Sequence, residues 1–260
     1  MSLAGRLAAR ARRAWLQRLP PEALQRELAG RRGALFLCYH SLSPELDDYP
    51  YRTAVAAFDR HLEMLAEGFD ILPAAAVVAE LRAGTASGRA RPLAAICFDD
   101  GYRDNWHLAT PVLERYGVPA TLFAARDLLR QGGASFMTEA ELCALAAHPL
   151  WQVGAHGISH SVLNALHPDD RRREMAGCRD WLADLLGAPP AGFAYPLGQT
   201  SPSIVATARD LYDHAFSTDR RIGPGFDAWQ ILRYCPTAIQ DDPNELAREL
   251  LLAPFEDGRQ

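Results

Sequence analysis

Short runs of apolar residues alternate along the chain with longer segments in which apolar residues recur at helical spacing. The apolar runs predict buried strands at residues 34–39, 93–98, 120–125, 151–155, 192–195, 214–217 and, with a less regular pattern, 229–234. The helical spacing predicts helices at residues 54–67, 74–83, 107–116, 138–147, 169–187, 202–211 and 243–252. Strands that alternate with helices in this way are typical of parallel sheets with crossover helices.

Seven strand–helix units favour a single α/β domain at residues 33–260, built as a distorted, incomplete (β/α) barrel of about seven strands. An open doubly wound sheet is the alternative. In a barrel, the residues that directly follow the strands gather on one rim, where barrel enzymes carry their chemistry. Here those residues are His40, Asp99, Asp100, Arg126, Asp127, His156 and the turn at 196–198.

Residues 1–32 differ in composition from the rest of the chain and predict an arginine-rich helical segment. They hold eight arginines and two glutamates, with Leu3, Leu7, Trp15 and Leu19 roughly on one helical stripe. A basic amphipathic helix can lie on an anionic membrane surface. We therefore expect either peripheral contact with the inner membrane surface or a solvated helix packed against the domain.

The composition narrows the class of protein. The chain of 260 residues has a net charge of −5 and a pI near 5.9, which argues against a general nucleic-acid binder. No apolar run is long enough for a transmembrane helix or a secretory signal. Five scattered cysteines without CxxC spacing favour a reducing, cytoplasmic compartment over a disulfide framework. The absence of lysine excludes Schiff-base chemistry and a P-loop lysine.

Two short stretches carry the candidate chemistry. Asp99 and Asp100 end a predicted buried strand, although adjacent carboxylates disfavour each other's ionisation unless a positive group lies beside them. His156 and His160 are four residues apart, so on a helical turn both imidazoles would face one metal ion. With Asp100 they would form a facial set with open coordination positions. A solvent-exposed turn at Asp99-Asp100 and purely structural histidines are the alternatives.

Three motifs in this order, "FDDGY", "HGISH" and "FAYPLG", resemble those of the polysaccharide deacetylases with a NodB-homology domain. These are carbohydrate esterase family 4 enzymes, and the FxYPxG subgroup is the most similar. "LCYHSL", "YGVPATLF" and "AFST" also resemble that subgroup, so the resemblance extends over about residues 33–240. It implies a distorted (β/α) barrel and a hydrolase that removes N-acetyl, sometimes O-acetyl or N-formyl, groups from sugars with one divalent metal ion. Zinc is expected first, with cobalt, nickel or manganese as alternatives.

The resemblance also implies roles for individual residues. Asp99 would be the general base, and Asp100, His156 and His160 would bind the metal. The third-motif turn would shape one wall of the substrate groove, with the Leu197 backbone N–H stabilising the oxyanion. The substrate-binding residues expected in this way are Tyr102, Tyr195, Pro196, Leu197 and Gly198.

The chain departs from the family pattern at three places. Gly157 replaces a serine or threonine, and Ala194 stands where many members have an arginine that pairs with the catalytic aspartate. No histidine follows His214, although the family usually has a late histidine as general acid. We expect His40, at the end of the first strand, to take that role.

These observations favour a metal-dependent hydrolase that removes N-acetyl groups from an amino sugar, either a glycan or a lipid-linked or nucleotide-linked sugar. A sugar N-deformylase and a metal-independent amidase of the same fold are enzymatic alternatives. A deacetylase-like domain without activity, which only binds glycan or a partner protein, is the alternative from another class.

Overall fold

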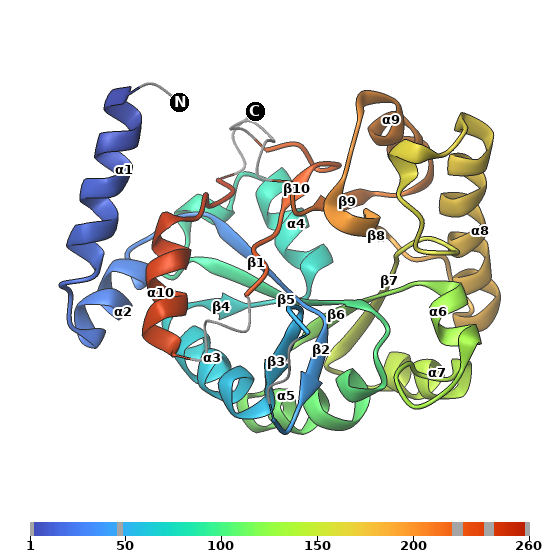
Figure 1. The fold of residues 1–260 in the computed structure, drawn as a ribbon, viewed down its shortest axis with the longest axis horizontal. Helices are drawn as coiled ribbons and strands as arrows, with labels where there is room; N and C mark the ends of the chain where they lie inside the picture. Colours follow the sequence, from blue (N-terminus) through green and yellow to red (C-terminus); the bar gives the residue numbers. More distant parts are fainter. Residues whose placement is uncertain (1–2, 46–48, 220–225, 237–241, 258–260) are drawn as a thin grey trace.

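Parallel strands form the centre of the computed structural model, which describes residues 3–45, 49–219, 226–236 and 242–257 (Figure 1). Hydrogen-bonded neighbours follow the order β1 (Ala34–Tyr39), β5 (Leu93–Asp100), β6 (Ala120–Ala124), β7 (Trp151–Ala155), β8 (Gly192–Ala194), β9 (His214–Ser217) and β10 (Ile231–Leu232). A two-residue strand, β4 (Asp70–Ile71), also pairs with β5. The remaining strands, β2 (Ser41–Ser43) and β3 (Arg52–Ala54), form a separate small sheet.

The chain returns from β10 to β1, so the sheet closes almost completely. Leu37 and Tyr234 form a parallel bridge beyond the end of β10. The Tyr234 N–H donates to Phe36 O at 2.7 Å, and the Cys38 N–H donates to Tyr234 O at 2.8 Å. The prediction of a single α/β domain with a nearly closed barrel of seven strands is therefore confirmed. The last strand was predicted too long, because regular pairing stops at Leu232.

Side chains alternate between the inside of the barrel and the helical layer around it, as the pleat of a strand requires. Phe36, Phe123 and Phe216 pack together inside the barrel. The ring centroid of Phe216 lies 5.2 Å from that of Phe36 and 5.3 Å from that of Phe123. Each of the three is fully buried, so truncation of one to alanine would cost about 3–5 kcal/mol. This packed interior places the functional groups at the carboxyl ends of the strands.

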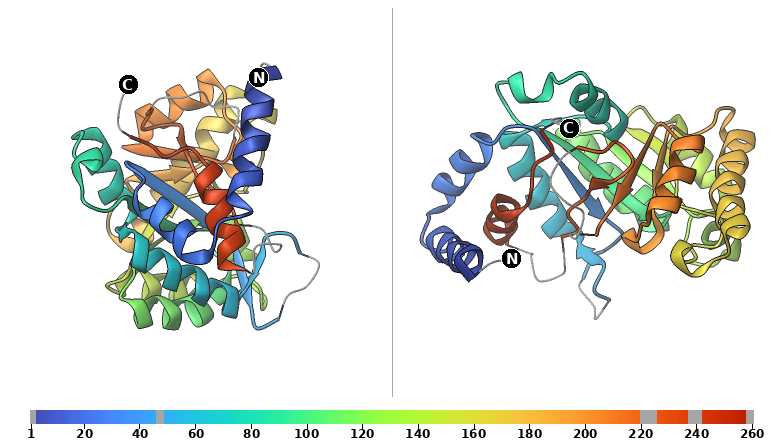
Figure 2. Two further views of the ribbon diagram at one scale, coloured as in Figure 1. Left: turned by 90° about the vertical axis from the view of Figure 1, so that its left-hand side faces the viewer. Right: turned by 90° about the horizontal axis from the view of Figure 1, so that it is seen from above.

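Helices cover the outside of the barrel (Figures 1 and 2). They are α2 (Pro21–Ala29), α3 (Val55–Gly68), α4 (Ala74–Arg82), α5 (Thr110–Tyr116), α6 (Arg126–Gln131), α7 (Glu139–Ala147), α8 (Pro168–Leu186), α9 (Pro202–Leu211) and α10 (Pro243–Leu252). Local sequence explains several boundaries: α8 has proline at its first position, and Gly187 follows it in the left-handed region. Most predicted helices are present within a few residues of the expected bounds.

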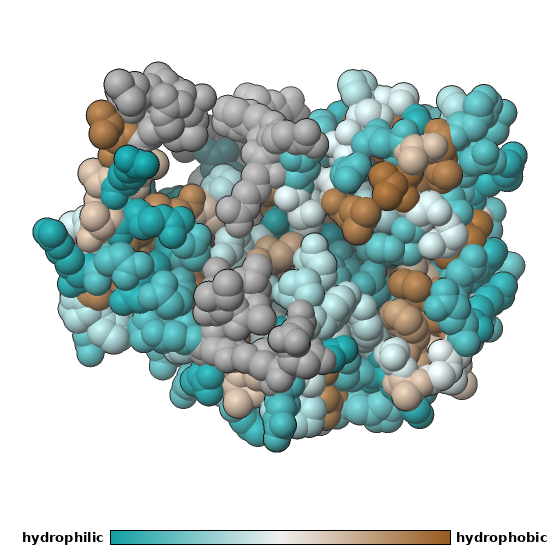
Figure 3. Space-filling view, viewed as in Figure 1, coloured by the Kyte–Doolittle hydropathy of each residue, from teal (hydrophilic) through white to brown (hydrophobic). Residues whose placement is uncertain are grey.

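The first helix, α1 (Leu3–Leu16), lies beside α10 at one edge of the molecule (Figures 1 and 2). Arg12 donates to Leu251 O at 3.2 Å, and Arg13 pairs with Glu249 at 2.6 Å. Leu7 and Trp15 are 59% and 46% exposed, and apolar side chains lie beside hydrophilic ones at this corner of the surface (Figure 3). Within the described residues, no helix combines the length and apolar character needed to cross a bilayer.

Candidate metal centre and catalytic site

Strand β5 ends in a sharp bend that brings two adjacent carboxylates into one cavity. Asp100 has a φ of +75°, an unusual conformation for a residue other than glycine, and Gly101 follows with a φ of +91°. That φ favours glycine, and a Cβ on Gly101 would also lie 2.5 Å from the Leu129 side chain. Without the bend, Asp99 and Asp100 would point to opposite faces of the strand. Backbone strain of this kind is typical of functional sites.

Asp100, His156 and His160 form a candidate metal site, because one ligand atom from each lies within 4.8 Å of the others. Asp100 Oδ1 is 3.4 Å from His156 Nε2 and 3.2 Å from His160 Nε2. This buried oxygen accepts no hydrogen bond from the described residues. An unsatisfied carboxylate oxygen between two imidazoles fits a divalent cation, and two histidines with one carboxylate are a common ligand set.

The orientation of His156 is fixed by the main chain of β8. Its Nδ1 lies 2.8 Å from Ala194 O, so Nδ1 carries the hydrogen and donates it. That tautomer leaves the lone pair of Nε2 free for a metal ion, and a hydrogen bond on the far side of the ring is typical of metal-binding histidines. The backbone carbonyl of Ala194 thus helps to orient His156.

The two histidines do not lie on a helical turn, and that part of the prediction is wrong. The segment from His156 to His160 is an irregular turn with Gly157 at φ +87° and His160 at φ +59°. Glu174 of α8 holds this turn by accepting hydrogen bonds from Ile158 N at 2.9 Å and Ser159 N at 2.8 Å. Sequence reasoning missed Glu174, which follows a run of arginines and reads as part of a solvated helix.

Arg233, immediately after β10, makes a buried ion pair with Asp99. Its Nη1 and Nη2 lie 2.7 Å from Asp99 Oδ1 and Oδ2, and the two side chains are 0% and 4% exposed. Burial alone would raise the pKa of Asp99, but the Arg233 charge outweighs it and the pKa falls well below its usual range. Asp99 is therefore ionised at neutral pH, as a general base must be.

The arginine that the sequence lacks at position 194 is thus supplied by a different strand. Sequence analysis missed Arg233, although one signal was available. It lies inside the run predicted as a strand at 229–234, directly after the apolar pair Ile231-Leu232, much as His40, Asp99 and His156 follow their own apolar runs. The irregular pattern of that run hid the strand end from which Arg233 projects.

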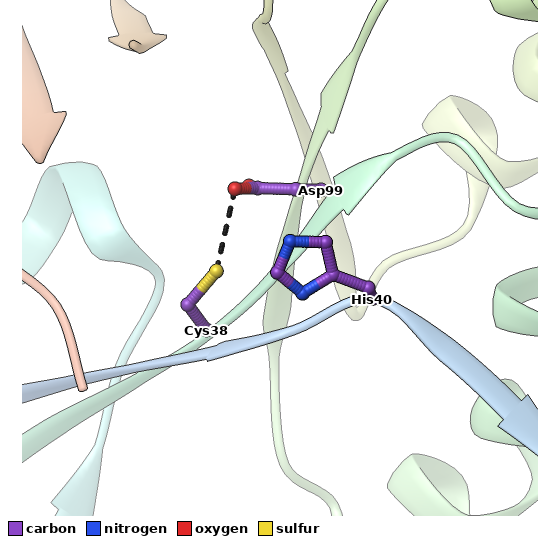
Figure 4. Close-up of side chains that lie close together, drawn as sticks. All are labelled: Cys38, His40 and Asp99. Atoms are coloured by element: carbon purple, nitrogen blue, oxygen red, sulfur yellow. Dashed lines mark hydrogen bonds between the residues drawn. The ribbon is translucent and has the colours of Figure 1, made fainter. Parts of the chain in front are cut away.

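Cys38 and His40 approach Asp99 from the end of β1, and Figure 4 shows both side chains beside it. Cys38 Sγ donates to Asp99 Oδ2 at 3.3 Å. Burial lowers the pKa of His40, although both aspartates oppose that change, so the imidazole is neutral near pH 7. Ligand atoms of Cys38, His40 and Asp99 also lie within 4.8 Å of one another. Arg233 already occupies both oxygens of Asp99 and would repel a second cation there.

A cavity of about 140 Å³ opens over these residues. Its lining is His40, Tyr49, Tyr51, Asp99, Asp100, His156, His160, Leu197, Gly198, Thr218 and Cys235. The structure thus brings together the proposed base, the three candidate ligands and two residues of the third-motif turn. Tyr49, Tyr51, Thr218 and Cys235 were not singled out in the sequence.

The other predicted substrate-binding residues do not line this cavity. Tyr195 is fully buried and donates through its hydroxyl to Trp229 O at 2.8 Å, and Pro196 is buried beside it. Tyr102 is half-buried, with its hydroxyl 2.9 Å from that of Tyr49. Leu197, by contrast, is 56% exposed and has a φ of +56° at the cavity wall.

The fold and the site define a (β/α)-barrel protein with a candidate mononuclear metal centre. Residues 87–213 match the family model described as polysaccharide deacetylase. A curated relative, the polysaccharide deacetylase YxkH of Bacillus subtilis (strain 168), is 32% identical to this chain over 113 residues. The aligned part is 44% of this chain and 39% of YxkH. By these comparisons, residues 87–213 are similar to the polysaccharide deacetylase family. The chain aligns with only about two fifths of the length of that curated relative.

Two solved structures show the same fold. The Streptococcus pyogenes deacetylase PplD, in complex with acetate, has a TM-score of 0.71 and 20% identity, over 85% of this chain and 99% of PplD. IcaB from Ammonifex degensii also has a TM-score of 0.71, with 22% identity over 86% of this chain and 98% of IcaB. At these identities the likeness concerns the fold alone.

Proposed function

We propose that the protein is a metal-dependent sugar N-deacetylase. One observation carries the proposal: a buried, unsatisfied oxygen of Asp100 lies between two imidazoles and beside a second carboxylate that Arg233 keeps ionised. Asp100, His156 and His160 would hold one divalent ion, with zinc as the first expectation. The family supports a carbohydrate substrate.

When bound, a divalent ion would polarise the acyl carbonyl and lower the pKa of a water molecule from about 15.7 toward 7. Asp99 would then accept a proton from the attacking water, as an ionised carboxylate in a buried site can. The Leu197 N–H would donate to the developing oxyanion. His40, neutral in the resting site and close to Asp99, would receive that proton from Asp99 and deliver it to the leaving amine.

The cavity supports a small acyl group as the part of the substrate that is enclosed. The cavity of about 140 Å³ is small and opens beside the 47% exposed ring of Tyr51 and the exposed Leu197, where the rest of a sugar would lie. The site therefore accommodates an N-acetyl or N-formyl group on a glycan, a lipid-linked sugar or a nucleotide-linked sugar. Acetyl is our proposal, in line with the family.

Peripheral membrane contact at the cytoplasmic face is a further part of the proposal. Leu7 and Trp15 of α1 are exposed, and the surrounding arginines would attract anionic lipid. Sedimentation with vesicles of neutral phosphatidylcholine, with and without one third phosphatidylglycerol, tests this contact. We expect binding only to the anionic vesicles and less binding by Trp15→Ala; equal recovery in the supernatant with both vesicle types would refute it.

Metal stoichiometry, measured by mass spectrometry on the purified chain, tests the proposed function. We expect about one divalent ion per chain, and its loss in Asp100→Ala and in His156→Ala. Chelator-sensitive release of acetate and free amine from acetylated sugars should accompany the ion. Because the chain contains no lysine, an amine-reactive dye has little protein background.

Other outcomes identify the alternatives. Release of formate instead of acetate would indicate a deformylase, and activity that survives chelation would indicate a metal-independent amidase. Bound metal without hydrolysis of any acylated sugar would indicate a glycan-binding or partner-binding domain. Absence of metal after reconstitution would refute the proposal.

A further inference from the structure

Cys38 and Cys235 lie side by side at the seam where the barrel closes. Leu37 pairs with Tyr234 in parallel register, so the next residue on each strand is a cysteine. The Cys38 N–H also donates to Tyr234 O at 2.8 Å. This register places the two cysteines next to each other, and neither forms a disulfide.

Only one of these thiols is reached from the cavity. Cys38 is fully buried, whereas Cys235 is half-buried and lines the cavity over the candidate metal site. A molecule the size of hydrogen peroxide can therefore reach Cys235 by the same opening that an acyl group would use. Cys97 and Cys178 are buried and do not line this cavity, and Cys143 lies half-buried on α7.

We propose that Cys38 and Cys235 form an oxidative modification site, in which peroxide converts the two thiols into a reversible disulfide. Cys235 sulfur attacks one peroxide oxygen, giving a sulfenic acid and one water. Cys38 sulfur then displaces the second oxygen as water and forms the S–S bond. The two thiols lose two electrons and two protons in total, and one peroxide becomes two waters.

The order of these steps follows from the surroundings of each thiol. Burial raises the pKa of Cys38 well above its usual value, so this thiol is a poor first nucleophile. Its position against Cys235 makes it the resolving thiol once the sulfenic acid has formed. Cys97 is the partner of Cys38 on the other side of β1, so a Cys38–Cys97 disulfide is the competing product that the register allows.

The disulfide would have two structural consequences. Cys38 Sγ would lose its hydrogen to the reaction and would no longer donate to Asp99 Oδ2. It would also join β1 to the segment after β10, a seam that the Tyr234 and Cys38 backbone hydrogen bonds hold in the reduced protein. Closing so long a loop lowers the entropy of the unfolded chain and raises the melting temperature.

The test is peroxide titration of the reduced, purified full chain, followed by alkylation and peptide mapping without reduction. Cleavage after arginine gives peptides 33–52 and 234–248, which contain Cys38 and Cys235. We expect these two peptides to be cross-linked at a peroxide concentration at least about tenfold below that which modifies Cys143. Thiol reductant should release them, and the oxidised chain should melt several degrees above the reduced chain.

Two matched variants complete the test. Cys235→Ser should abolish the cross-link, and Cys143→Ser should leave it unchanged; equal melting temperatures of the reduced forms would show that both variants fold. Over-oxidation of Cys235 without a cross-link would overturn the proposal, as would a cross-link from Cys38 to Cys97. The readout needs no substrate, so failure here is distinct from failure of the proposed deacetylase activity.

Discussion

Replacing Arg233 by methionine removes the cation that neutralises Asp99 and leaves a buried carboxylate without its main partner. The two side chains are 0% and 4% exposed, and both guanidinium contacts are 2.7 Å long. With charge centres about 4 Å apart and an effective dielectric constant of about 20, the attraction is ~4 kcal/mol. Breaking a buried pair from one side costs about 3–5 kcal/mol, so we expect Arg233→Met to lower the free energy of unfolding by that amount at pH 7.

The pH dependence follows from the sign of the pKa shift. In the parent protein, the pKa of Asp99 is lower in the folded state than in the unfolded state, where it is about 3.9. The ion pair therefore stabilises the protein fully above about pH 3.9, and this stabilisation is lost as the pH falls through the pKa of the folded state. In Arg233→Met, burial would raise the folded pKa instead. Stability then falls as pH rises above about 3.9. The difference between parent and variant should therefore be larger at pH 7 than near pH 4, because the variant regains stability as its buried carboxylate is protonated while the parent keeps its ion pair.

Urea unfolding followed by circular dichroism at both pH values measures this difference. The double variant Asp99→Asn with Arg233→Met should recover much of the lost stability, because neither buried charge remains. Arg115→Met is the matched control: Arg115 contacts both oxygens of Asp59 at 2.7 Å, but its side chain is 60% exposed. We expect that change to cost about 1 kcal/mol or less. Equal costs for the buried and exposed pairs, or a cost independent of pH, would refute the reasoning.

Three further predictions concern other parts of the fold. Burial lowers the pKa of His214 to about 4, so the folded protein keeps this ring neutral, and the free energy of unfolding should fall by ~2 kcal/mol between pH 7.5 and 5. Urea unfolding of His214→Gln should show a smaller fall over the same range. The same pH dependence in the variant and the parent would contradict this. Glu174→Ala should loosen the turn that carries the second histidine ligand and weaken metal binding about tenfold in a chelator competition, whereas Asp184→Ala, exposed on the same helix, should not. Gly198→Ala should cost about 2–4 kcal/mol by thermal unfolding, because φ is +66° and the new Cβ would lie 2.6 Å from Thr218 N; a stable variant would show that this turn can shift.

The strand ends were the most predictable part of the site. Buried parallel strands read as continuous apolar runs, so the residue after each run could be placed on the barrel rim without knowledge of the helices. Asp99, Asp100 and His156 were found in this way. The two-residue strand β4 and the three-residue strands β2 and β3 were missed, because their sequences, DI, SLS and RTA, are not continuous apolar runs.

The supporting contacts were not predictable, for a physical reason. Arg233 and Asp99 are 134 positions apart, and Glu174 is 15 positions from Ser159. Such pairs depend on how elements meet in space, and neither residue shows a local pattern that names its partner. The positive φ of Asp100, which turns adjacent carboxylates into one cavity, likewise has no local sequence signal apart from the glycine that follows it.

The closed ring also determines what counts as the smallest working unit of this protein. The family match ends at residue 213 and begins at residue 87, so it contains the proposed base and ligands but neither His40 nor Arg233. A fragment cut to that match would expose the unpaired edges of β5 and β8 and would lack the arginine that pairs with Asp99. A truncated version of this protein should therefore keep all residues from β1 to Tyr234, and fusion partners are best joined outside that range.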